Sequence, residues 1–436
     1  MIVSDKKRQS IKESLSATRE KRKRQRCRVF ELKITGAKMS RSQHEHLRRL
    51  FLEAKWFYNH VLSQDDVFNT DTTVKSAPVK CGDRFEEREL RSLSSQMKQS
   101  LAERVQTSIK GLSTKKKHGA KVGKLKFKRS VSAVLLKQHG NTYSFTNSGN
   151  RLKLQRLKGT VRIRGFDQLP AGADLANAVL LKKASGYYLK VTVYTDKEEC
   201  RQVDKPPMGI DIGIKHQFAF SNGVIVDYRV PMSQCEKLRS LYRELSRRKQ
   251  NSANWYKTLH RIRLEFEYLA NCKHDIIKKL CGFLAREHGI ICFQKESLSA
   301  WQRLYGRKLL DTSLGSFLSA VKERAALPAE IDRWFPSTQL CSNLDCNHRA
   351  KKALSDRVHH CPVCGLLLDR DINAAINIEQ EGIDQLIREG KITGTERCLR
   401  GGYPATLAQR MVDYYNTIPR VSARLSVEAR SPLRSS

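Results

Sequence analysis

Four of the twelve cysteines lie within one short segment, and their spacing strongly limits how that segment can fold. They form a C-x₄-C pair and a C-x₂-C pair with fourteen residues between the pairs: Cys341, Cys346, Cys361 and Cys364. Two close pairs of thiolates are typical of a structural Zn²⁺ site of the ribbon type, which has no open position for catalysis. The alternatives are four free thiols, or a mixed site in which His348, His359 or His360 replaces a cysteine.

The other eight cysteines are scattered along the chain, which argues against a disulfide framework and for a reducing compartment. The N-terminus is polar and has no signal-peptide pattern, and no apolar run approaches the roughly 20 residues that span a bilayer. We therefore expect a cytoplasmic protein with no membrane partner. Hydrophobic residues make up 39% of the 436 residues, which is enough for a sizeable core in each of several domains.

The charge of the chain limits its choice of partner. Lysine and arginine number 82 against 44 acidic residues, which gives a net charge of +38. Such an excess repels itself in a compact fold unless a polyanion shares the surface. Nucleic acid is the obvious polyanion, and a membrane surface is the alternative.

The N-terminal half has both strand and helix patterns. Residues 1–26 are polar and basic, and they are either an irregular solvated tail or an arm that becomes ordered on nucleic acid. Residues 27–36 have the pattern of a strand, and an amphipathic helix follows an N-cap at Ser40. Six short strand patterns then lie between residues 133 and 195, separated by turn residues. They predict a small β-barrel that encloses a helical insert.

Two basic segments are candidates for contact with phosphate groups. Residues 114–130 are rich in lysine and contain two glycines and a single phenylalanine, which predicts an exposed loop. Residues 233–289 are strongly helical, with an apolar seam suited to pairing with another helix. The side opposite this seam is basic, and its members are Arg247, Arg248, Lys249, Lys257, Arg261 and Arg263.

Acidic residues lie at the ends of predicted elements in three distant parts of the sequence. Asp211 follows the apolar residues of a buried strand that leads into a hairpin, where an acid is costly unless a cation or a donor compensates it. Glu296 lies near the end of a second apolar strand. Asp369 and Asp371 lie at the start of a predicted helix.

Carboxylates that converge from several elements can hold two Mg²⁺ or Mn²⁺ ions about 4 Å apart, an arrangement that hydrolyses phosphodiester bonds. For each acid alone, a helix N-cap or a solvated side chain is the simpler interpretation. The spacing is compatible with both a two-metal site and three separate acids.

Three segments together resemble TnpB, the RNA-guided nuclease of insertion-sequence transposons, and the small type V CRISPR effectors. GIDIGIKHQFAFSNG (209–223) is similar to the first motif of their split RuvC domain, and ICFQKESL (291–298) to the second. The segment that begins WFPSTQLC and ends DRDINAAINI (334–378) is similar to their zinc ribbon followed by the third motif. The resemblance covers roughly residues 27–380.

This resemblance implies a multidomain fold of the α+β or α/β class: an RNase H-like RuvC nuclease domain with an inserted zinc ribbon, preceded by a β-barrel wedge domain with a helical recognition insert. The implied parts are a basic arm (1–26), the wedge barrel (27–39 and 113–203), the recognition insert (40–112), the nuclease domain (204–335 and 366–382), the zinc ribbon (336–365) and a C-terminal tail (383–436). The tail is polar and contains glycines, so it is either disordered or in contact with RNA.

The resemblance also implies an RNA-guided DNA endonuclease of a prokaryotic cell, associated with the nucleoid when it is bound to DNA. Its partners would be a guide RNA and target double-stranded DNA with a short flanking motif. The metal-binding catalytic acids of the family fall on Asp211, Glu296 and Asp371, which would hold two Mg²⁺ or Mn²⁺ ions, whereas Asp369 would cap the helix. One structural Zn²⁺ would lie on the four cysteines.

Two departures from the family pattern concern these sites. The first cysteine pair is C-x₄-C where the family usually has C-x₂-C, and Ser297 follows Glu296 where an aspartate is more common. The first affects the geometry of the zinc site, whereas catalysis needs only the glutamate.

Two other functions fit the same scaffold. A guide-dependent DNA-binding repressor would have lost at least one of the three acids, and all three are present. A guide-free RuvC-type nuclease or resolvase would need neither the barrel with its insert nor this much positive charge. A single active site implies that two strands are cut in sequence or by two copies, so we expect a monomer or a homodimer.

Overall fold

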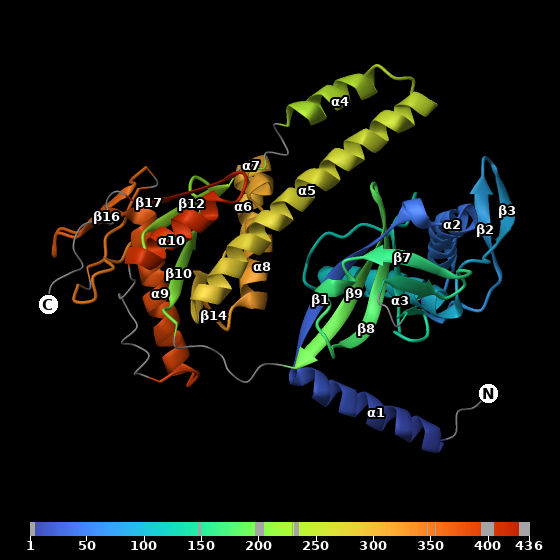
Figure 1. Cartoon of the computed structure of the whole chain (residues 1–436), viewed down its shortest axis with the longest axis horizontal. Helices are drawn as coiled ribbons and strands as arrows, with labels where there is room; N and C mark the ends of the chain where they lie inside the picture. The colour runs from blue at the N-terminus through green and yellow to red at the C-terminus, as the bar shows by residue number, and fades with distance from the viewer. Residues whose placement is uncertain are drawn as a thin grey trace. The chain divides into compact units, whose positions relative to one another are not determined.

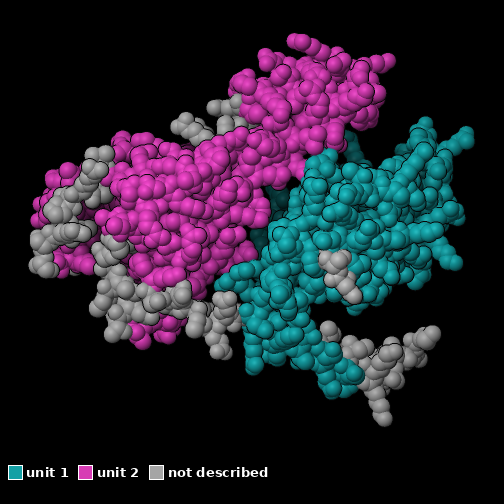
Figure 2. All heavy atoms as spheres, viewed as in Figure 1, with its two compact units in different colours: residues 1–198 teal, residues 199–436 magenta. Residues whose placement is uncertain are grey.

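In the computed structural model the chain divides into two compact units, residues 1–198 and 199–436 (Figure 2). The residues that the structure describes are 5–146, 150–196, 205–228, 230, 235–346, 348–353, 355–393 and 405–426. Each unit has its own sheet, helices and hydrophobic core, so the expected multidomain architecture of helices and sheets is confirmed. Within the described ranges, no helix is both long enough and apolar enough to cross a membrane.

Unit 1 is built on a seven-stranded antiparallel sheet with the strand order β4-β8-β9-β1-β7-β6-β5 (Figure 1). Its strands are β1 (Gln25–Ile34), β4 (Ala133–Leu136), β5 (Tyr143–Phe145), β6 (Arg151–Leu154), β7 (Thr160–Arg164), β8 (Asp174–Lys183) and β9 (Gly186–Asp196). The strand predicted from residue 27 and the six predicted between residues 133 and 195 are all present. β1 occupies the centre of the sheet because it pairs with β9 on one side and with β7 on the other.

The other elements of unit 1 are α1 (Asp5–Lys23), α2 (Arg41–Ser63), β2 (Ser76–Cys81), β3 (Arg84–Glu89) and α3 (Ser95–Lys117). α2 begins at a capping box, in which the side chains of Ser40 and Gln43 each accept a hydrogen bond from the other's backbone N–H. The apolar face that follows is buried in the core of the unit and consists of Leu47, Leu50, Phe51, Ala54, Phe57 and Val61.

The basic segments of unit 1 are more helical than the sequence predicts. The described part of the arm is helix α1, so the irregular-tail interpretation is wrong there. Lys21 and Arg22 at the end of α1 form ion pairs with Asp174 on β8, which tie this helix to the sheet. α3 continues through Lys117, because lysine is a good helix former and its charge is favourable near a helix C-terminus. The exposed loop therefore starts only after α3.

Unit 2 is built on a six-stranded mixed sheet with the strand order β14-β13-β10-β11-β12-β17. Its strands are β10 (Met208–Ile212), β11 (Phe218–Phe220), β12 (Val224–Tyr228), β13 (Ile290–Gln294), β14 (Leu327–Ile331) and β17 (Val421–Leu425). β10, β13 and β14 are parallel neighbours, and β11 and β12 form the antiparallel continuation that the sequence predicts after β10. The two predicted apolar strands, β10 and β13, therefore lie side by side.

Helices cover both faces of this sheet. The helices of unit 2 are α4 (Glu236–Ser246), which packs on α5, and α5 (Ala253–Glu287), α6 (Leu298–Tyr305), α7 (Arg307–Thr312), α8 (Leu314–Arg324), α9 (Arg370–Arg388) and α10 (Ala405–Asn416). Alternate residues of β13 pack into different cores: Ile291 and Phe293 lie in the core shared with α5, α8 and α10, whereas Ile290 and Cys292 lie in the core shared with α9. α9 packs along β10, β13 and β14 (Figure 1).

Part of the C-terminal segment belongs to this sheet, so the disordered-tail interpretation is wrong for residues 405–425. β17 pairs antiparallel with β12 at the edge of the sheet. In α10, the side chains of Met411 and Tyr415 are fully buried. Sequence reasoning missed the strand because it is only five residues long and its neighbouring residues are polar.

Candidate functional site

β10 and β13 carry two of the predicted acids to the same edge of the sheet in unit 2. These strands are parallel and Ile210 pairs with Phe293, so both chains leave the sheet in the same direction. Asp211 is half-buried within β10. Glu296 is also half-buried and follows two residues after the end of β13. The carboxyl ends of neighbouring parallel strands are the usual position of a binding site in an open α/β sheet.

The third acid, Asp371, lies in the first turn of α9. Asp369 is the N-cap of this helix, and its carboxylate accepts hydrogen bonds from the backbone N–H groups of Asp371 and Ile372 at 2.8 and 3.3 Å. The Asp371 carboxylate instead pairs with the guanidinium of Arg370 at 3.2 Å. The two neighbouring aspartates thus have different roles. Asp369 caps the helix, whereas the Asp371 carboxylate accepts no hydrogen bond from the backbone N–H groups at the helix N-terminus in the described structure and can contact other groups.

A close approach between α9 and β10 brings Asp371 towards Asp211. A Cβ atom at Gly209 would lie 2.0 Å from the carbonyl oxygen of Ala375, so only glycine fits at this crossing. The buried Glu379 carboxylate accepts hydrogen bonds from the Gly209 N–H at 3.1 Å and from the Ser221 hydroxyl. Sequence reasoning missed Glu379; its only signal was an acid on the otherwise apolar face of the helix.

The charges of the other two predicted acids act on Asp211. Burial raises the pKa of Asp211 well above its usual value, and the charges of Asp371 and Glu296 raise this pKa further, whereas the Arg370 charge opposes the shift. Burial also raises the pKa of Glu296, against the opposing charge of Arg333 and a hydrogen bond from a backbone N–H. A half-buried carboxylate whose pKa is raised by the charges of two other acids would be stabilised by cations, so oxygen-binding metal ions suit this edge of the sheet.

The four cysteines of the predicted ribbon form a second site in unit 2. Their sulfur atoms all lie within 4.8 Å of one another, and among the described residues no comparable group of acids or histidines is found. The Sγ atoms of Cys341 and Cys364 are 3.5 Å apart, and those of Cys346 and Cys361 are 3.7 Å apart. Four sulfurs at Zn–S bonds of about 2.3 Å in a tetrahedron would be separated by about 3.8 Å. The donor set therefore fits Zn²⁺ without a histidine ligand, despite the longer C-x₄-C loop.

The ribbon is attached to α9 by the asparagines of the DINAAIN segment. Asn373 donates a hydrogen bond to the Leu340 carbonyl at 2.8 Å and accepts one from the Ser342 N–H at 3.0 Å. Asn377, one turn later, donates to the carbonyls of Ser337 and Leu340, both at 2.8 Å. Both asparagines are buried. The first cysteine loop is thereby fixed to the helix that carries Asp371 in its first turn, a role that the sequence left unassigned.

Comparisons with known proteins bear on this segment. Residues 318–378, which run from α8 through the cysteines into α9, match the family model described as Cas12f1-like, TNB domain. A protein of Streptomyces pristinaespiralis, named as a candidate RNA-guided DNA endonuclease, is 27% identical over 249 residues, which cover 55% of this chain and 61% of the relative. These matches make the chain similar to the TnpB/Cas12f-like family. The chain thus matches about three fifths of the length of that relative.

One solved structure is also similar to this chain. It is a chain of the cryo-EM structure of the Cas12f1-sgRNA-target DNA complex, with a TM-score of 0.43 and 12% sequence identity. The match covers 78% of this chain and 83% of the other.

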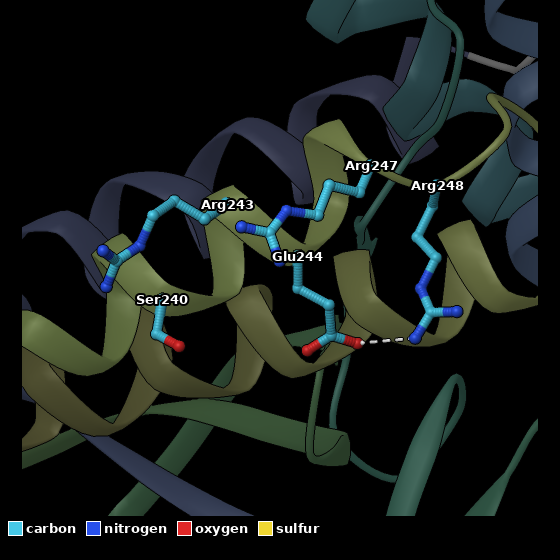
Figure 3. Close-up of a pocket in the computed structure, with 5 residues that line it drawn as sticks. All are labelled: Ser240, Arg243, Glu244, Arg247 and Arg248. Atoms are coloured by element: carbon cyan, nitrogen blue, oxygen red, sulfur yellow. Dashed lines mark hydrogen bonds and ion pairs between the residues drawn. The ribbon is translucent and has the colours of Figure 1, made fainter.

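The α4–α5 helix pair of unit 2 carries a basic pocket. The pocket has a volume of about 460 Å³ and is lined by Ser240, Arg243, Glu244, Arg247 and Arg248 (Figure 3). Glu244 is already engaged, since its carboxylate accepts from Arg248 at 3.3 Å, from Arg261 at 2.8 Å and from Thr258 at 3.0 Å. By contrast, the guanidinium groups of Arg243 and Arg247 have no ion-pair partner within the described part of the chain.

Two unpaired guanidinium groups beside a pocket suit a phosphate, because guanidinium binds phosphate oxygens through paired N–H donors. The sequence predicted Arg247 and Arg248 as part of a basic face but missed Arg243. Its signal was the four-residue spacing between Arg243 and Arg247, which places both on one side of a helix.

Proposed function

We propose that this chain is an RNA-guided DNA endonuclease whose active site lies at the carboxyl edge of the β10 and β13 strands, in an RNase H-like domain of the RuvC type. One observation carries the proposal: Asp211 on β10 is a half-buried acid at the carboxyl edge of the sheet, and the charges of Glu296 after β13 and Asp371 at the start of α9 add to burial in raising its pKa. Asp211, Glu296 and Asp371 are the proposed catalytic residues. The name of the Streptomyces relative supports the same activity.

The proposed site would hold two Mg²⁺ or Mn²⁺ ions, since carboxylate oxygens and water are their preferred ligands. When bound, such a pair of ions activates a water molecule and stabilises the attacking and leaving oxygens of a phosphodiester. Asp211, Glu296 and Asp371 would supply the protein ligands. Burial favours the protonated forms of Asp211 and Glu296, so the metal ions and the Arg370 charge would together favour the ionised carboxylates that ligation requires.

The four cysteines would hold one structural Zn²⁺, whose role is to fix the position of α9. Asn373 and Asn377 connect the first cysteine loop to this helix, and Asp371 lies in its first turn. Loss of zinc would therefore release the segment that carries one of the three catalytic acids. On this proposal the zinc site contributes to cleavage through position alone.

The proposed partners are a guide RNA and double-stranded target DNA with a short flanking motif. The net charge of +38, the pocket beside Arg243 and Arg247, and the lysine-rich loop after α3 support binding of polyanions. We further propose that the sheet of unit 1 is the wedge domain and that α2, the β2–β3 hairpin and α3 form its recognition insert. Pairing between guide and target would provide sequence specificity, while the protein reads the flanking motif.

The proposal is tested by a cleavage assay on a plasmid library. The protein is purified with the RNA from its native locus and mixed with Mg²⁺ and plasmids that carry the matching target beside randomised flanks. We expect cutting that depends on the guide, on a particular flank and on Asp371, so that Asp371→Ala is inactive. Guide-dependent binding without cutting would favour the repressor, and cutting without a guide would favour a resolvase-like nuclease.

A further inference from the structure

Trp334 is the most exposed large aromatic residue in the described part of the chain, with 78% of its surface accessible. It lies in the turn that follows β14, between that strand and the zinc ribbon. Its neighbour Phe335 faces the opposite way and packs against the core under α9. Removing an indole ring from water is strongly favourable, so an indole held in solvent while the next aromatic ring is buried requires a reason.

Hydrogen bonds hold the turn around Trp334 in one shape. The buried Gln294 amide, at the end of β13, donates to the carbonyls of Asp332 and Phe335 at 3.1 and 2.7 Å. Its oxygen accepts a hydrogen bond from the Ser337 hydroxyl at 3.0 Å. The Asp332 carboxylate in turn accepts a hydrogen bond from the backbone N–H of Trp334 at 2.8 Å. The indole is therefore presented to solvent from a fixed backbone, so little conformational entropy would be lost when a flat partner binds it.

The same bonds place this turn next to the acids. Gln294 lies two residues before Glu296, and the Lys295 N–H donates to the Ile331 carbonyl at the end of β14 at 3.1 Å. Arg333 links the two groups, because its guanidinium carbon lies 4.6 Å from the centre of the Trp334 ring. The charge of Arg333 also acts on the Glu296 carboxylate and lowers its pKa against the effect of burial.

An exposed aromatic ring with a stacked guanidinium has the two features that single-stranded nucleic acid requires. The ring offers a flat apolar face to a base, and the cation attracts the neighbouring phosphate. A nuclease that cuts a single strand must also hold that strand in register with its catalytic acids, which a base contact beside the site would do.

We propose that Trp334 is a stacking platform for one nucleobase of the DNA strand, next to the phosphate to be cut at the proposed site of Asp211, Glu296 and Asp371, and that Arg333 faces the adjoining phosphate. This inference rests on the proposed nuclease function. Stacking on a ring is tolerant of sequence because every base has a flat face, so the platform would fix the position of the cut and not the choice of target.

The first test measures the contact without cleavage. The guide-loaded Asp371→Ala protein is titrated with uncleaved target DNA, and tryptophan fluorescence is recorded. Stacking of a base quenches an indole, so we expect a loss of emission that disappears in Asp371→Ala/Trp334→Phe. The control Asp371→Ala/Trp56→Phe removes a tryptophan packed against the core of unit 1 and should keep the quenching. Equal quenching with and without Trp334 would overturn the proposal.

The second test locates the base. Single abasic nucleotides are introduced in turn along the target strand, and single-turnover cleavage by the otherwise unmodified protein is compared with that by Trp334→Ala and Trp334→Tyr. One abasic position beside the cut should slow the unmodified protein roughly 5- to 150-fold, the range expected for one stacked base. Trp334→Ala should cut intact DNA slowly, and an abasic nucleotide at that position should not lower its rate further. Trp334→Tyr should recover most of the cleavage rate.

The outcomes separate this inference from the nuclease proposal. If the unmodified protein cuts and Trp334→Ala cuts equally fast with the same abasic profile, the platform is refuted while the nuclease remains. If the unmodified protein does not cut, the nuclease proposal fails, and the fluorescence titration still decides whether DNA stacks on Trp334.

Discussion

Gly209→Ala tests whether the close crossing of β10 and α9 sets the geometry of the acids. The added Cβ would lie 2.0 Å from the Ala375 carbonyl oxygen, whereas ordinary contact begins at 3.4 Å. The two backbones must therefore separate by about 1.4 Å at the crossing, since neither atom lies at the end of a flexible side chain. The same shift strains the hydrogen bond from the Gly209 N–H to Glu379.

Two effects of different size are expected from this separation. Overpacking of this kind costs about 1–3 kcal/mol, which lowers the melting temperature of a unit of this size by roughly 2–10 °C. Asp211 lies two residues from the crossing, and a displacement of about 1 Å in a catalytic group costs on the order of 100-fold in rate. The protein should thus stay folded at 25 °C yet cut at about one hundredth of the normal rate.

The assay is single-turnover cleavage of guide-matched DNA, with thermal unfolding of the same samples. Gly111→Ala is the matched control, because a Cβ at this position in α3 meets no atom within 4 Å. It should leave cleavage unchanged and stabilise the helix by up to about 1 kcal/mol. Cleavage by Gly209→Ala at the normal rate, with an unchanged melting temperature, would refute the idea that this crossing positions the acids.

Three further changes are predicted. Replacing both Arg243 and Arg247 by alanine should weaken RNA binding about tenfold in a filter-binding series. The slope of binding against salt concentration should fall by the equivalent of about one to two phosphate contacts. Arg239→Ala is the control and should change little, because the Arg239 guanidinium already pairs with a glutamate. Cys361→Ser should reduce bound zinc from about one ion per chain to nearly none, as measured by atomic emission, and should lower the melting temperature, because a structural zinc site stabilises the fold; a full complement of zinc in the variant would exclude the site. The pKa of Asp211 in the folded protein is raised above its unfolded value of about 3.9. At a pH between these two values the folded state binds more protons than the unfolded state. The stability of the metal-free protein therefore falls as pH rises from about 4. Asp211→Asn should therefore melt at a higher temperature than the parent at pH 7.5 in EDTA, with Mg²⁺ raising the melting temperature of the parent more than that of the variant; the opposite order would contradict the buried acid cluster.

The parts of the fold that follow local patterns could be predicted from the sequence. Turn residues separate the six strands β4 to β9 of unit 1, and β10 and β13 have the continuous apolar runs that are typical of buried strands. The cysteine group was also predictable, because its spacing brings the thiols together without any knowledge of the remaining fold.

What could not be predicted depends on contacts between distant segments. Nothing in the sequence near residue 421 indicates that β17 pairs with β12, since that register is set by a strand almost 200 residues earlier. Likewise, Gly209 and Glu379 have no shared pattern, and their relation exists only once α9 lies on β10. Arg333 and Trp334 gain their position from the hydrogen bonds that Gln294 donates to the residues on either side of them. No pattern in the sequence connects Gln294 with this turn.

The choice between the two neighbouring aspartates of α9 gives the most direct measurement. Asp369→Asn keeps a good N-cap, because asparagine accepts the same backbone hydrogen bonds, whereas Asp371→Asn removes a proposed metal ligand. Both variants are loaded with guide RNA and assayed for single-turnover cleavage and for target binding. We predict that Asp369→Asn cuts within a few-fold of the normal rate and that Asp371→Asn binds the target without cutting it. Normal cutting by Asp371→Asn would contradict the proposed active site.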